Sequence, residues 1–347
     1  MPNLIVTNFN RNFTGVSATA AGVVRQQAHD YDLALAGHPL PGCPDPITKS
    51  EAIRLSRTPP KDRPFTIWHV RRNPEMRAAL WGRDVLRLPI RIVFTSAAQR
   101  FHSAFPRWLI SRMDAVIATT DRAAEFVPHV RATAPHGVDI EVFFPAKDRA
   151  KAWAETGYPG TKGLATIGRI RPEKGTDRFV EAMLTLLPDH PNLTALVIGR
   201  AAKSDQAFLS DLKSKIAAAN LSDRVLFPGE IAPDALPALM RALSVVVQLP
   251  RYEGYGMTPL EGMASGVPFV ATDAGYYRSF SGQGQTGVIV PEDDATATAK
   301  AISDLLGNPE RYGKMARNAR DAAETHFSIR SESDAINAVY ESLWAEG

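Results

Sequence analysis

The sequence predicts an α/β protein made of two doubly wound parallel sheets that face each other across a cleft. The chain has 347 residues, which is longer than most single domains. Apolar runs of strand length alternate with helical stretches, a pattern typical of parallel sheets covered by helices on both faces. Its 44% hydrophobic and 22% charged residues exclude a disordered, collagen-like or coiled-coil chain. Ligands of such sheets bind beyond the carboxyl ends of the strands, so we expect a ligand site in the cleft.

The first predicted domain covers residues 1–150. Residues 3–8 and 31–36 are predicted as strands with a helix at 16–29 between them, which makes a βαβ unit. An irregular insert with one short helix follows, because its residues are rich in Pro, Asp and Lys and lack a strong period. This insert spans residues 39–64, with its helix at 50–56. The elements predicted after it are strands at 65–70, 91–95 and 115–119 and helices at 75–86 and 101–113.

The second predicted domain covers residues 151–330 and follows a polar loop that contains prolines, at 144–161. The last amphipathic stretch, 333–344, is predicted as a helix, and we expect residues 330–347 to return to the first domain. Strands of the second domain are expected at 164–167, 194–198, 224–227, 244–248, 268–271 and 288–290, with helices between them.

The composition indicates a cytoplasmic protein without a metal cofactor. No stretch approaches the roughly 18 uncharged apolar residues of a membrane-spanning helix. The first residues, MPNLIVTNFN, lack the basic and long apolar regions of a secretory signal. The single cysteine, Cys43, can form neither an internal disulfide nor a zinc cage, which agrees with a reducing compartment and a metal-free scaffold.

Positive charge is concentrated in the first half of the chain. Residues 1–150 carry 20 Lys and Arg against 13 Asp and Glu, whereas the remainder carries 20 against 24. Arginine suits bidentate contact with phosphate or carboxylate, although a solvated basic face is the alternative for any single arginine. Much of the excess lies in two stretches, Arg71, Arg72, Arg77, Arg83, Arg87 and Arg91, then Arg100, Arg107 and Arg112.

The strongest motif is RYEGYGMTPLEGMASG at residues 251–266, which follows an apolar strand. Glu253 is therefore expected on the loop that leaves the carboxyl end of this strand. Thr258 is predicted as the N-cap of the next helix, which places Glu261 in its first turn.

This motif combines acids with glycines. Gly254 and Gly256 let backbone amides approach a ligand, and a helix N-terminus favours an anion. The motif therefore offers two carboxylates for sugar hydroxyls and amide donors for phosphate oxygens. The alternative is that Glu253 is a solvated loop residue and Glu261 only interacts with the helix dipole.

A second motif, LATIGRIRPEKG at residues 164–175, ends another predicted strand. It places Arg169 and Lys174 on one loop, where two cations can hold a pyrophosphate and neutralise the charge that builds on it as it leaves. Fixed cations would replace a metal ion in this role. The alternative is a set of surface ion pairs, which is the interpretation we adopt for Arg171.

Together these segments resemble the retaining glycosyltransferases of family 4, which have the GT-B fold of two Rossmann-like domains. The resemblance rests on the Arg and Lys after the GR pair and on the two glutamates spaced eight residues apart in EGYGMTPLE. Further matches cover most of the chain from Met113 onward, and FTSAAQRFHSAFPRWLISRMDAVIATT is similar to bacterial lipopolysaccharide core mannosyltransferases. The further matches to family 4 are His136-Gly137-Val138-Asp139, Phe143-Phe144-Pro145, GEIAPDALPALMR at 229–241 and GVIVP at 287–291. The segment at 229–241 resembles the one that borders the nucleotide base in the family.

The resemblance implies roles for the matching residues. Arg169 and Lys174 would bind the diphosphate of a nucleotide-sugar donor. Glu253 would contact hydroxyls of the donor sugar, and Glu261 would bind the ribose. The expected catalytic residues are therefore Glu253, Arg169, Lys174 and His69; the reason for including His69 is given below.

The first strand-to-helix loop matches the place where the family puts a glycine loop against the donor. Thr14 and Gly15 lie there, and a helix that starts at Ser17 would add amide donors; a simple tight turn is the alternative. The full set of implied donor contacts is Thr14, Gly15, Arg169, Lys174, Glu253, Gly254, Gly256, Met257, Thr258 and Glu261.

The sequence departs from the family at two places. Relatives often have a histidine just after the phenylalanine of the fourth strand, near the reacting sugar, where this chain has Thr95. His69, at a strand end, is the preferred substitute over His102, although a hydrogen-bonded structural histidine is the alternative. The second departure is Ser279, near which many relatives have a glutamate.

The acceptor is expected to meet the basic first domain. Arg71, Arg72, Arg100 and Arg107 are candidate contacts for an anionic, lipid-linked acceptor, with apolar side chains of residues 100–113 at a membrane surface. The alternative is that these apolar residues belong to the core. The enzyme would then be cytoplasmic, or peripheral on the inner face of the inner membrane. Nucleic acid is disfavoured as a partner because aromatic stacking positions and a known binding motif are lacking.

The resemblance implies transfer of a hexose, with retention of configuration, from a nucleotide-sugar co-substrate and without a metal. The preferred donor is GDP-mannose and the preferred acceptor is a lipopolysaccharide core. Three alternatives stay open: another donor in the same fold, a sugar-nucleotide epimerase or phosphorylase, and a non-catalytic nucleotide-binding protein.

Overall fold

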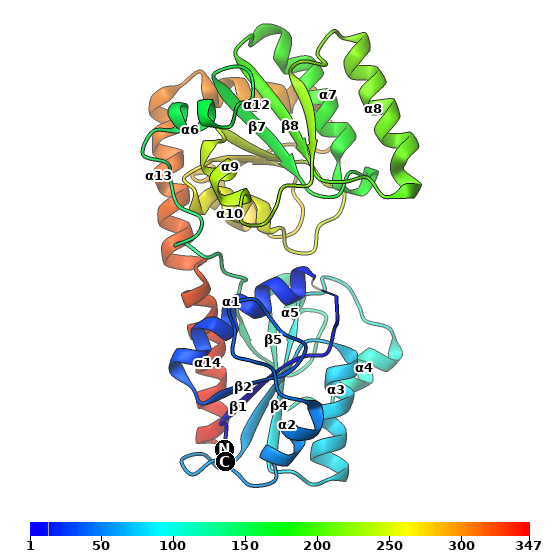
Figure 1. Cartoon of the computed structure of the whole chain (residues 1–347), viewed down its shortest axis with the longest axis vertical. Helices are drawn as coiled ribbons and strands as arrows, with labels where there is room; N and C mark the ends of the chain where they lie inside the picture. Colours follow the sequence, from blue (N-terminus) through cyan, green and yellow to red (C-terminus); the bar gives the residue numbers. More distant parts are fainter. Residues whose placement is uncertain (13) are drawn as a thin grey trace. The chain divides into compact units, whose positions relative to one another are not determined.

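The computed structural model describes residues 1–12 and 14–347, which divide into two compact units (Figure 1). The first unit joins Met1–Gly137 to Phe327–Gly347, and the second is Val138–His326. Each contains one parallel six-stranded sheet. The predicted α/β fold of two doubly wound domains is confirmed.

The first sheet has the strand order β2-β1-β3-β4-β5-β6. Five of its strands match predicted strands, but β6 was missed because its VRAT sequence is short, contains Arg131 and is only partly buried. The strands are β1 (Leu4–Asn8), β2 (Leu33–Gly37), β3 (Thr66–Val70), β4 (Ile90–Ser96), β5 (Ala115–Ala118) and β6 (Val130–Thr133).

Helices cover both faces of this sheet, as Figure 1 shows. One face packs on α1 and α14, and the other on α2, α3 and α4. The helices are α1 (Gly15–Asp30), α2 (Lys49–Leu55), α3 (Asn73–Leu80), which continues into a π-helical turn at Trp81–Val85, α4 (Ala104–Ile110), α5 (Asp121–Ala124) and α14 (Ile329–Ala345).

The second sheet has the order β12-β11-β10-β7-β8-β9. Its strands run β7 (Lys162–Ile167), β8 (Leu193–Ile198), β9 (Val225–Gly229), β10 (Val245–Gln248), β11 (Phe269–Ala271) and β12 (Gly287–Ile289). One core cluster lies between this sheet and α7, α8, α12 and α13. The helices are α6 (Arg149–Glu155), α7 (Thr176–Leu186), α8 (Gln206–Ala218), α9 (Leu236–Ala242), α10 (Met257–Ala264), α11 (Tyr277–Phe280), α12 (Ala295–Leu306) and α13 (Pro309–His326).

The boundary between the units lies at Gly137, earlier than the predicted boundary at residue 150. The residues that follow Gly137 pack on the second unit. Arg320 donates from Nη1 to the carbonyl oxygens of Ile140, at 3.3 Å, and Phe143, at 2.8 Å. These contacts, made by a helix far along the chain, are not visible in local sequence patterns.

The chain returns to the first unit through α14. Trp344 is 5% exposed and donates from its indole nitrogen to the carbonyl oxygen of Phe65 at 3.0 Å. Its ring packs against Tyr31, and the Arg63 guanidinium lies over it at 4.3 Å. The last helix is therefore part of the first unit's core.

None of the helices in residues 1–12 and 14–347 combines the length and apolar character needed to cross a lipid bilayer.

This packing predicts that Trp344→Ala destabilises the first unit. Removing a buried tryptophan typically costs about 3 to 5 kcal/mol, because it leaves a cavity and here also an unpaired carbonyl. Thermal unfolding should show an earlier first transition. The matched control is Trp108→Ala, whose side chain is 54% exposed and should change the transition little; equal effects of both changes would contradict this account.

Candidate functional site

Two of the predicted site residues meet at the carboxyl edge of the second sheet. The strands β7 and β10 are neighbours in this sheet, so the loops that follow them lie side by side. Lys174, from the loop after β7, places Nζ 2.6 Å from Oε2 of Glu253, from the loop after β10. Both side chains are mostly buried, with 25% and 19% of their surface exposed. The two strongest motifs therefore form one site.

Backbone and side-chain contacts hold these two loops together. The amide of Arg251 donates to the carbonyl oxygen of Glu173 at 3.0 Å. The Arg251 guanidinium binds both carboxylate oxygens of Asp177, at 2.8 and 2.7 Å, and this ion pair keeps the pKa of Asp177 below its usual range. Arg251 and Asp177 are thus positioning residues that the sequence analysis did not single out.

Glycine is required next to Lys174. Gly175 has φ +67, a left-handed conformation that favours glycine, and it is the N-cap of α7. A Cβ atom at this position would lie 1.8 Å from the carbonyl oxygen of Leu249, at the end of the β10 segment. This close approach of two backbones brings Lys174 within reach of Glu253.

The loop that carries Glu253 is packed on aromatic side chains. Gly256 has φ +95, and a Cβ there would lie 2.1 Å from a ring carbon of Tyr277. Tyr255 stacks on Tyr276 with ring centroids 5.4 Å apart, and Phe280 contacts both rings edge-on. Sequence reasoning treated residues 276–279 only as a departure from the family, whereas they support the site.

Two details of the motif at residues 251–266 differ from the prediction. The helix α10 begins at Met257 with Gly256 as its N-cap, so Thr258 is inside the helix and is not the N-cap. Glu261 consequently lies in the second turn, not in the first. The left-handed glycine lets the chain turn into the helix two residues earlier than the threonine signal suggests.

Glu261 has an unusual environment. Its side chain is partly buried, and its carboxylate forms no hydrogen bond or ion pair with any residue that the structure describes. Desolvation raises the pKa of this carboxyl to about 7. An acid that lacks protein donors in such a place can accept hydrogen bonds from ligand hydroxyls.

Arg169 lies on the same edge but not in the Lys174–Glu253 pair. Its exposed side chain has no ion pair or side-chain hydrogen bond within the described chain, and it lines a cavity of about 590 Å³. The cavity is bordered by the carboxyl ends of β7, β8 and β9 and by Glu230 and Ile231, within the segment that resembles a nucleotide-base border.

In the first unit, the loop after β1 is tied to the start of α3. Arg72 donates from Nη2 to the hydroxyls of Thr14, at 3.3 Å, and Ser17, at 2.9 Å. It also pairs with Glu75 at 3.2 Å, and Glu75 has no exposed surface. The helix α1 begins at Gly15, before the predicted start. Arg72 thus holds the Thr14–Gly15 loop in place, a structural role that occupies much of its guanidinium.

His69 lies inside the first unit. Its side chain has no exposed surface, Nδ1 is hydrogen-bonded to the hydroxyl of Tyr340, and Nε2 lies 2.7 Å from Oγ1 of Thr95. Burial, and next the charge of Arg71, keep the pKa of His69 well below its usual range, so the ring is neutral. A ring with both nitrogens occupied and no exposed surface does not reach a substrate. The structure therefore favours the hydrogen-bonded structural alternative over a catalytic one.

His69 nevertheless contacts Thr95, the residue that stands where relatives have the histidine. Thr95 is partly exposed near the carboxyl end of β4, and its hydroxyl is oriented by His69 from behind. Tyr340, from α14, fixes the other side of the ring. His69 is thus a positioning residue for the Thr95 hydroxyl.

The arginines of the first unit separate into two groups. Arg83, Arg91 and Arg112 pair with Asp84 or Asp114. Arg100 and Arg107 are exposed and have no side-chain hydrogen bond or ion pair with the residues described. Burial lowers the pKa of Arg71, and its Nη1 is buried without a partner in residues 1–12 and 14–347. Arg77 and Arg87 are likewise exposed and have no side-chain hydrogen bond or ion pair with the described residues. Of the four predicted acceptor contacts, Arg71, Arg100 and Arg107 therefore have no ion-pair partner in the described chain, whereas Arg72 pairs with Glu75.

The apolar residues of this region also divide. Leu109 and Met113 are buried, as the alternative to membrane contact expected. Phe105 and Trp108 are 53% and 54% exposed, and Phe101 is exposed as well.

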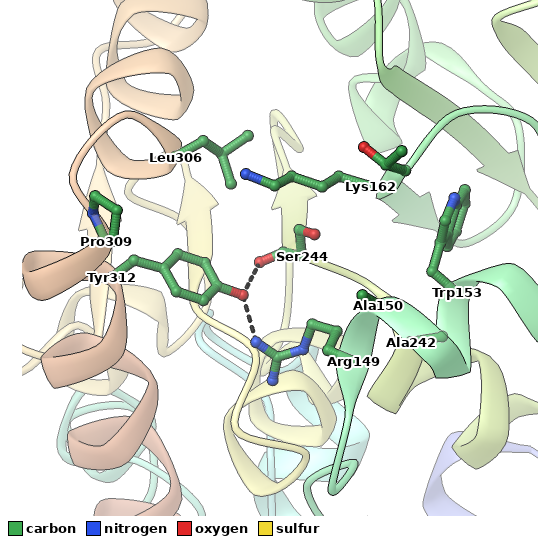
Figure 2. A pocket seen from close by; sticks show the side chains of 10 residues that line it. Arg149, Ala150, Trp153, Lys162, Ala242, Ser244, Leu306, Pro309 and Tyr312 are labelled. Atoms are coloured by element: carbon green, nitrogen blue, oxygen red, sulfur yellow. Dashed lines mark hydrogen bonds between the residues drawn. The ribbon is translucent and has the colours of Figure 1, made fainter.

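A separate pocket of about 280 Å³ lies at the opposite, amino edge of the second sheet (Figure 2). It is lined by Lys162 at the start of β7 and by Ser244 just before β10. Arg149 donates to the hydroxyl of Tyr312, which in turn donates to the carbonyl oxygen of Ser244. These contacts explain how α6 and α13 are joined, and they lie away from the edge that carries Lys174 and Glu253.

Within residues 1–12 and 14–347, no three His, Cys, Asp or Glu side chains are grouped closely enough to hold a metal ion.

Comparison with known proteins identifies the family. Residues 149–322 match the family model described as glycosyl transferases group 1. The chain belongs to the group 1 glycosyltransferases. It is 40% identical over 344 residues to the lipopolysaccharide core biosynthesis mannosyltransferase LpcC of Rhizobium leguminosarum bv. viciae, covering 98% of this chain and 96% of the relative.

Two further comparisons agree. The chain is 40% identical to the lipopolysaccharide core biosynthesis mannosyltransferase LpsB of Rhizobium meliloti, over 98% of this chain and 97% of the relative. The crystal structure of Anabaena HepE in complex with UDP and glucose superimposes with a TM-score of 0.80 at 16% identity, and covers 99% of this chain and 100% of HepE. The latter likeness supports the fold, which is GT-B, and the family resemblance inferred from the two motifs is confirmed.

The geometry of this glycosyltransferase predicts that Gly175→Ala impairs catalysis. The added Cβ would clash with the Leu249 carbonyl, displace the loop and separate Lys174 from Glu253. We expect turnover to fall by about 100-fold, the usual cost of losing one charge-stabilising donor.

The matched control is Gly157→Ala. Gly157 also has a positive φ, +74, but nothing lies within 4 Å of its would-be Cβ. It should cost about 1 kcal/mol of stability through backbone strain and leave turnover unchanged. Equal losses of turnover in both variants would show that the Leu249 contact is not the reason.

Proposed function

We propose that the protein is a retaining mannosyltransferase that transfers mannose from GDP-mannose to a lipopolysaccharide core acceptor. The observation that carries this proposal is the 40% identity, over 98% of the chain, to two proteins named as lipopolysaccharide core mannosyltransferases. The alignment covers both units, the first, where the acceptor is proposed to bind, and the second, where the donor is proposed to bind.

The proposed donor site is the carboxyl edge of the second sheet. Lys174 and Arg169 bind the diphosphate, Glu253 accepts hydrogen bonds from hydroxyls of the mannose, and Glu261 accepts them from the ribose. The amide of Gly254 donates to Oε1 of Glu253 at 2.9 Å, so the phosphates are proposed to face the amides of Met257 and Thr258 at the start of α10. The Lys174–Glu253 contact supports this assignment, because one ion pair places a phosphate-binding cation beside a sugar-binding acid.

The proposed chemistry needs positioning and charge stabilisation more than a covalent intermediate. The bond between the anomeric carbon and the leaving phosphate oxygen breaks, and the acceptor hydroxyl oxygen forms its bond on the same face of the sugar. Attack on the same face retains the anomeric configuration, and transfer of the hydroxyl proton to the departing phosphate balances the charges. Arg169 and Lys174 stabilise the negative charge on the diphosphate, the role that a metal ion would otherwise fill.

The acceptor is proposed to be anionic and lipid-linked, and to bind the first unit. Arg71, Arg100 and Arg107 support this, because their guanidinium groups lack ion-pair partners among the described residues. Arg72 contributes indirectly by holding the Thr14 loop. An enzyme acting on such an acceptor would work in the cytoplasm or at the inner face of the inner membrane.

The test is incubation of the purified protein with a panel of nucleotide sugars and a truncated lipopolysaccharide core, followed by product mass and the anomeric coupling constant from NMR. We expect one added hexose from GDP-mannose, in the α configuration of the donor, with little effect of a chelator. Donor isomerisation, release of sugar 1-phosphate, inversion or strict dependence on a divalent ion would each refute part of the proposal.

The site predicts that Lys174→Ala and Glu253→Ala each lower transfer by about 100-fold or more, since each removes a group that stabilises or positions the reacting donor. The rate of mannose transfer at saturating acceptor is the measurement. The controls are Arg171→Ala and Glu173→Gln on the same loop, whose weaker pair is 3.6 Å apart. Near-normal rates in both site variants, with an intact fold, would remove the site assignment.

The raised pKa of Glu261 predicts that donor affinity depends on pH. If ribose hydroxyls donate to this carboxylate, the ionised form is the one that binds, so affinity should increase as the pH rises through about 7. At one pH unit below the pKa only about a tenth of the groups are ionised, which predicts roughly ten-fold weaker binding.

Titration calorimetry with GDP between pH 6 and pH 8.5 measures this effect. Glu261→Gln should flatten the profile, because the amide does not titrate. A wild-type profile that is flat, or that falls as the pH rises, would contradict the role of Glu261.

A further inference from the structure

One surface of the first unit exposes large aromatic side chains that no core explains. Trp81, Phe105 and Trp108 are 46%, 53% and 54% exposed. They line one groove of about 760 Å³, together with Lys49 and Arg77. We call these five residues the α3/α4 surface.

The groove is built by two helices and the turn that extends the first. Trp81 opens the π-helical turn at the end of α3, whereas Phe105 and Trp108 lie on α4, beside α3. The rings of Phe105 and Trp108 are nearly parallel, with centroids 6.2 Å apart. Figure 1 shows both helices on one side of the first sheet. Val85 and Leu86, which follow Trp81 in the chain, are exposed as well.

These aromatic rings are not required to fill the interior. The same helices bury other residues against the sheet, notably Met76 and Leu80 of α3 and Leu109 of α4. The helices are therefore apolar on two faces, of which only one is covered within the first unit. Large contiguous apolar patches are rare on the surfaces of monomeric proteins and mark binding sites, so three exposed aromatic rings around one groove point to a binding partner.

The charges beside the rings indicate what the partner is. Lys49 and Arg77 are exposed and have no side-chain hydrogen bond or ion pair within the part of the chain that is described, and the same holds for Arg107 on α4. The nearby Arg83 and Arg112 are instead neutralised by Asp84. The whole first unit carries 19 Lys and Arg against 14 Asp and Glu.

We propose that the α3/α4 surface binds an anionic lipid bilayer. Tryptophan and phenylalanine rings insert at the level of the headgroups, and the unpaired cations contact lipid phosphates. Because α3 begins directly after Arg72, this surface starts beside the carboxyl edge of the first sheet, where the acceptor is proposed to bind. The inference rests on the proposed function only in that the acceptor is lipid-linked.

Vesicle sedimentation tests the proposal with the full-length protein. The wild type should bind vesicles of phosphatidylglycerol and phosphatidylethanolamine, bind phosphatidylcholine vesicles weakly, and dissociate from the anionic vesicles at high salt. Phe105→Ala with Trp108→Ala should weaken binding by about ten-fold or more, since two exposed rings lose their apolar contact. Lys49→Gln with Arg77→Gln should weaken it by about five-fold per cation at low salt.

The matched control is Val142→Ala with Arg311→Gln, which removes from the second unit an exposed apolar side chain and an exposed cation that has no ion pair with the residues described. It should bind vesicles like the wild type. Circular dichroism and thermal unfolding establish whether each variant is folded. If the Phe105→Ala, Trp108→Ala variant does not fold, the Lys49→Gln, Arg77→Gln variant still tests the proposal. Equal binding by wild type and both α3/α4 variants, or no preference for anionic lipid, would overturn the proposal.

Two other measurements distinguish membrane binding from dimer formation at the same surface and from failure of the proposed function. A dimer that is lost in the aromatic variant, without vesicle binding by the wild type, would assign the surface to a second copy of the chain and overturn the proposal. The aromatic variant should transfer sugar normally to a delipidated core oligosaccharide but poorly to an acceptor embedded in vesicles. Absence of transfer by the wild type to either acceptor would refute the proposed function, whereas vesicle binding tests the surface independently.

Discussion

The contact between Lys174 and Glu253 is the interaction on which the proposed donor site depends. It joins two loops that are 79 residues apart in the chain but adjacent in space, because β7 and β10 are neighbouring parallel strands. A partly buried cation and acid at 2.6 Å neutralise each other until a ligand arrives. A diphosphate and a sugar can then share these groups, which places binding and charge stabilisation at one point. The close backbone contact at Gly175 and the Arg251–Asp177 ion pair fix the position of one loop relative to the other.

In the first unit, polar side chains of the buried core orient a polar group at the edge of the sheet. Thr95 is oriented by a neutral histidine that is itself held by Tyr340 of the last helix. A buried, fully hydrogen-bonded network of this kind is rigid, since any rearrangement leaves an unpaired polar group. The return of α14 therefore does more than cover the sheet, because it connects the end of the chain, through Tyr340 and His69, to the Thr95 hydroxyl at the carboxyl end of β4.

Arginine serves two purposes in this unit, and only the structure separates them. Arg72 and Arg83 hold loops and helices through buried or partly buried acids, so their charge is not available to a ligand. Arg77 and Arg107 have no such acids within the described residues; Arg77 lines the groove with the exposed aromatic rings, and Arg107 lies on α4 between Phe105 and Trp108 in sequence. The same residue type in the same stretch of sequence thus forms ion pairs within the protein in one case, and in the other is left without them in the described chain, which is the basis of the recognition role that we propose.

The sequence by itself determined the fold, the family and the identity of the strand-end motifs, because strand and helix periods and glycine spacing are local. It did not determine the helix start at Met257, which follows from the left-handed Gly256 packed on Tyr277. Nor did it decide between a catalytic and a buried His69, or between core and surface for Trp108. Those outcomes depend on which distant segments cover a residue, and burial of this kind is set only when the helices pack on their sheets.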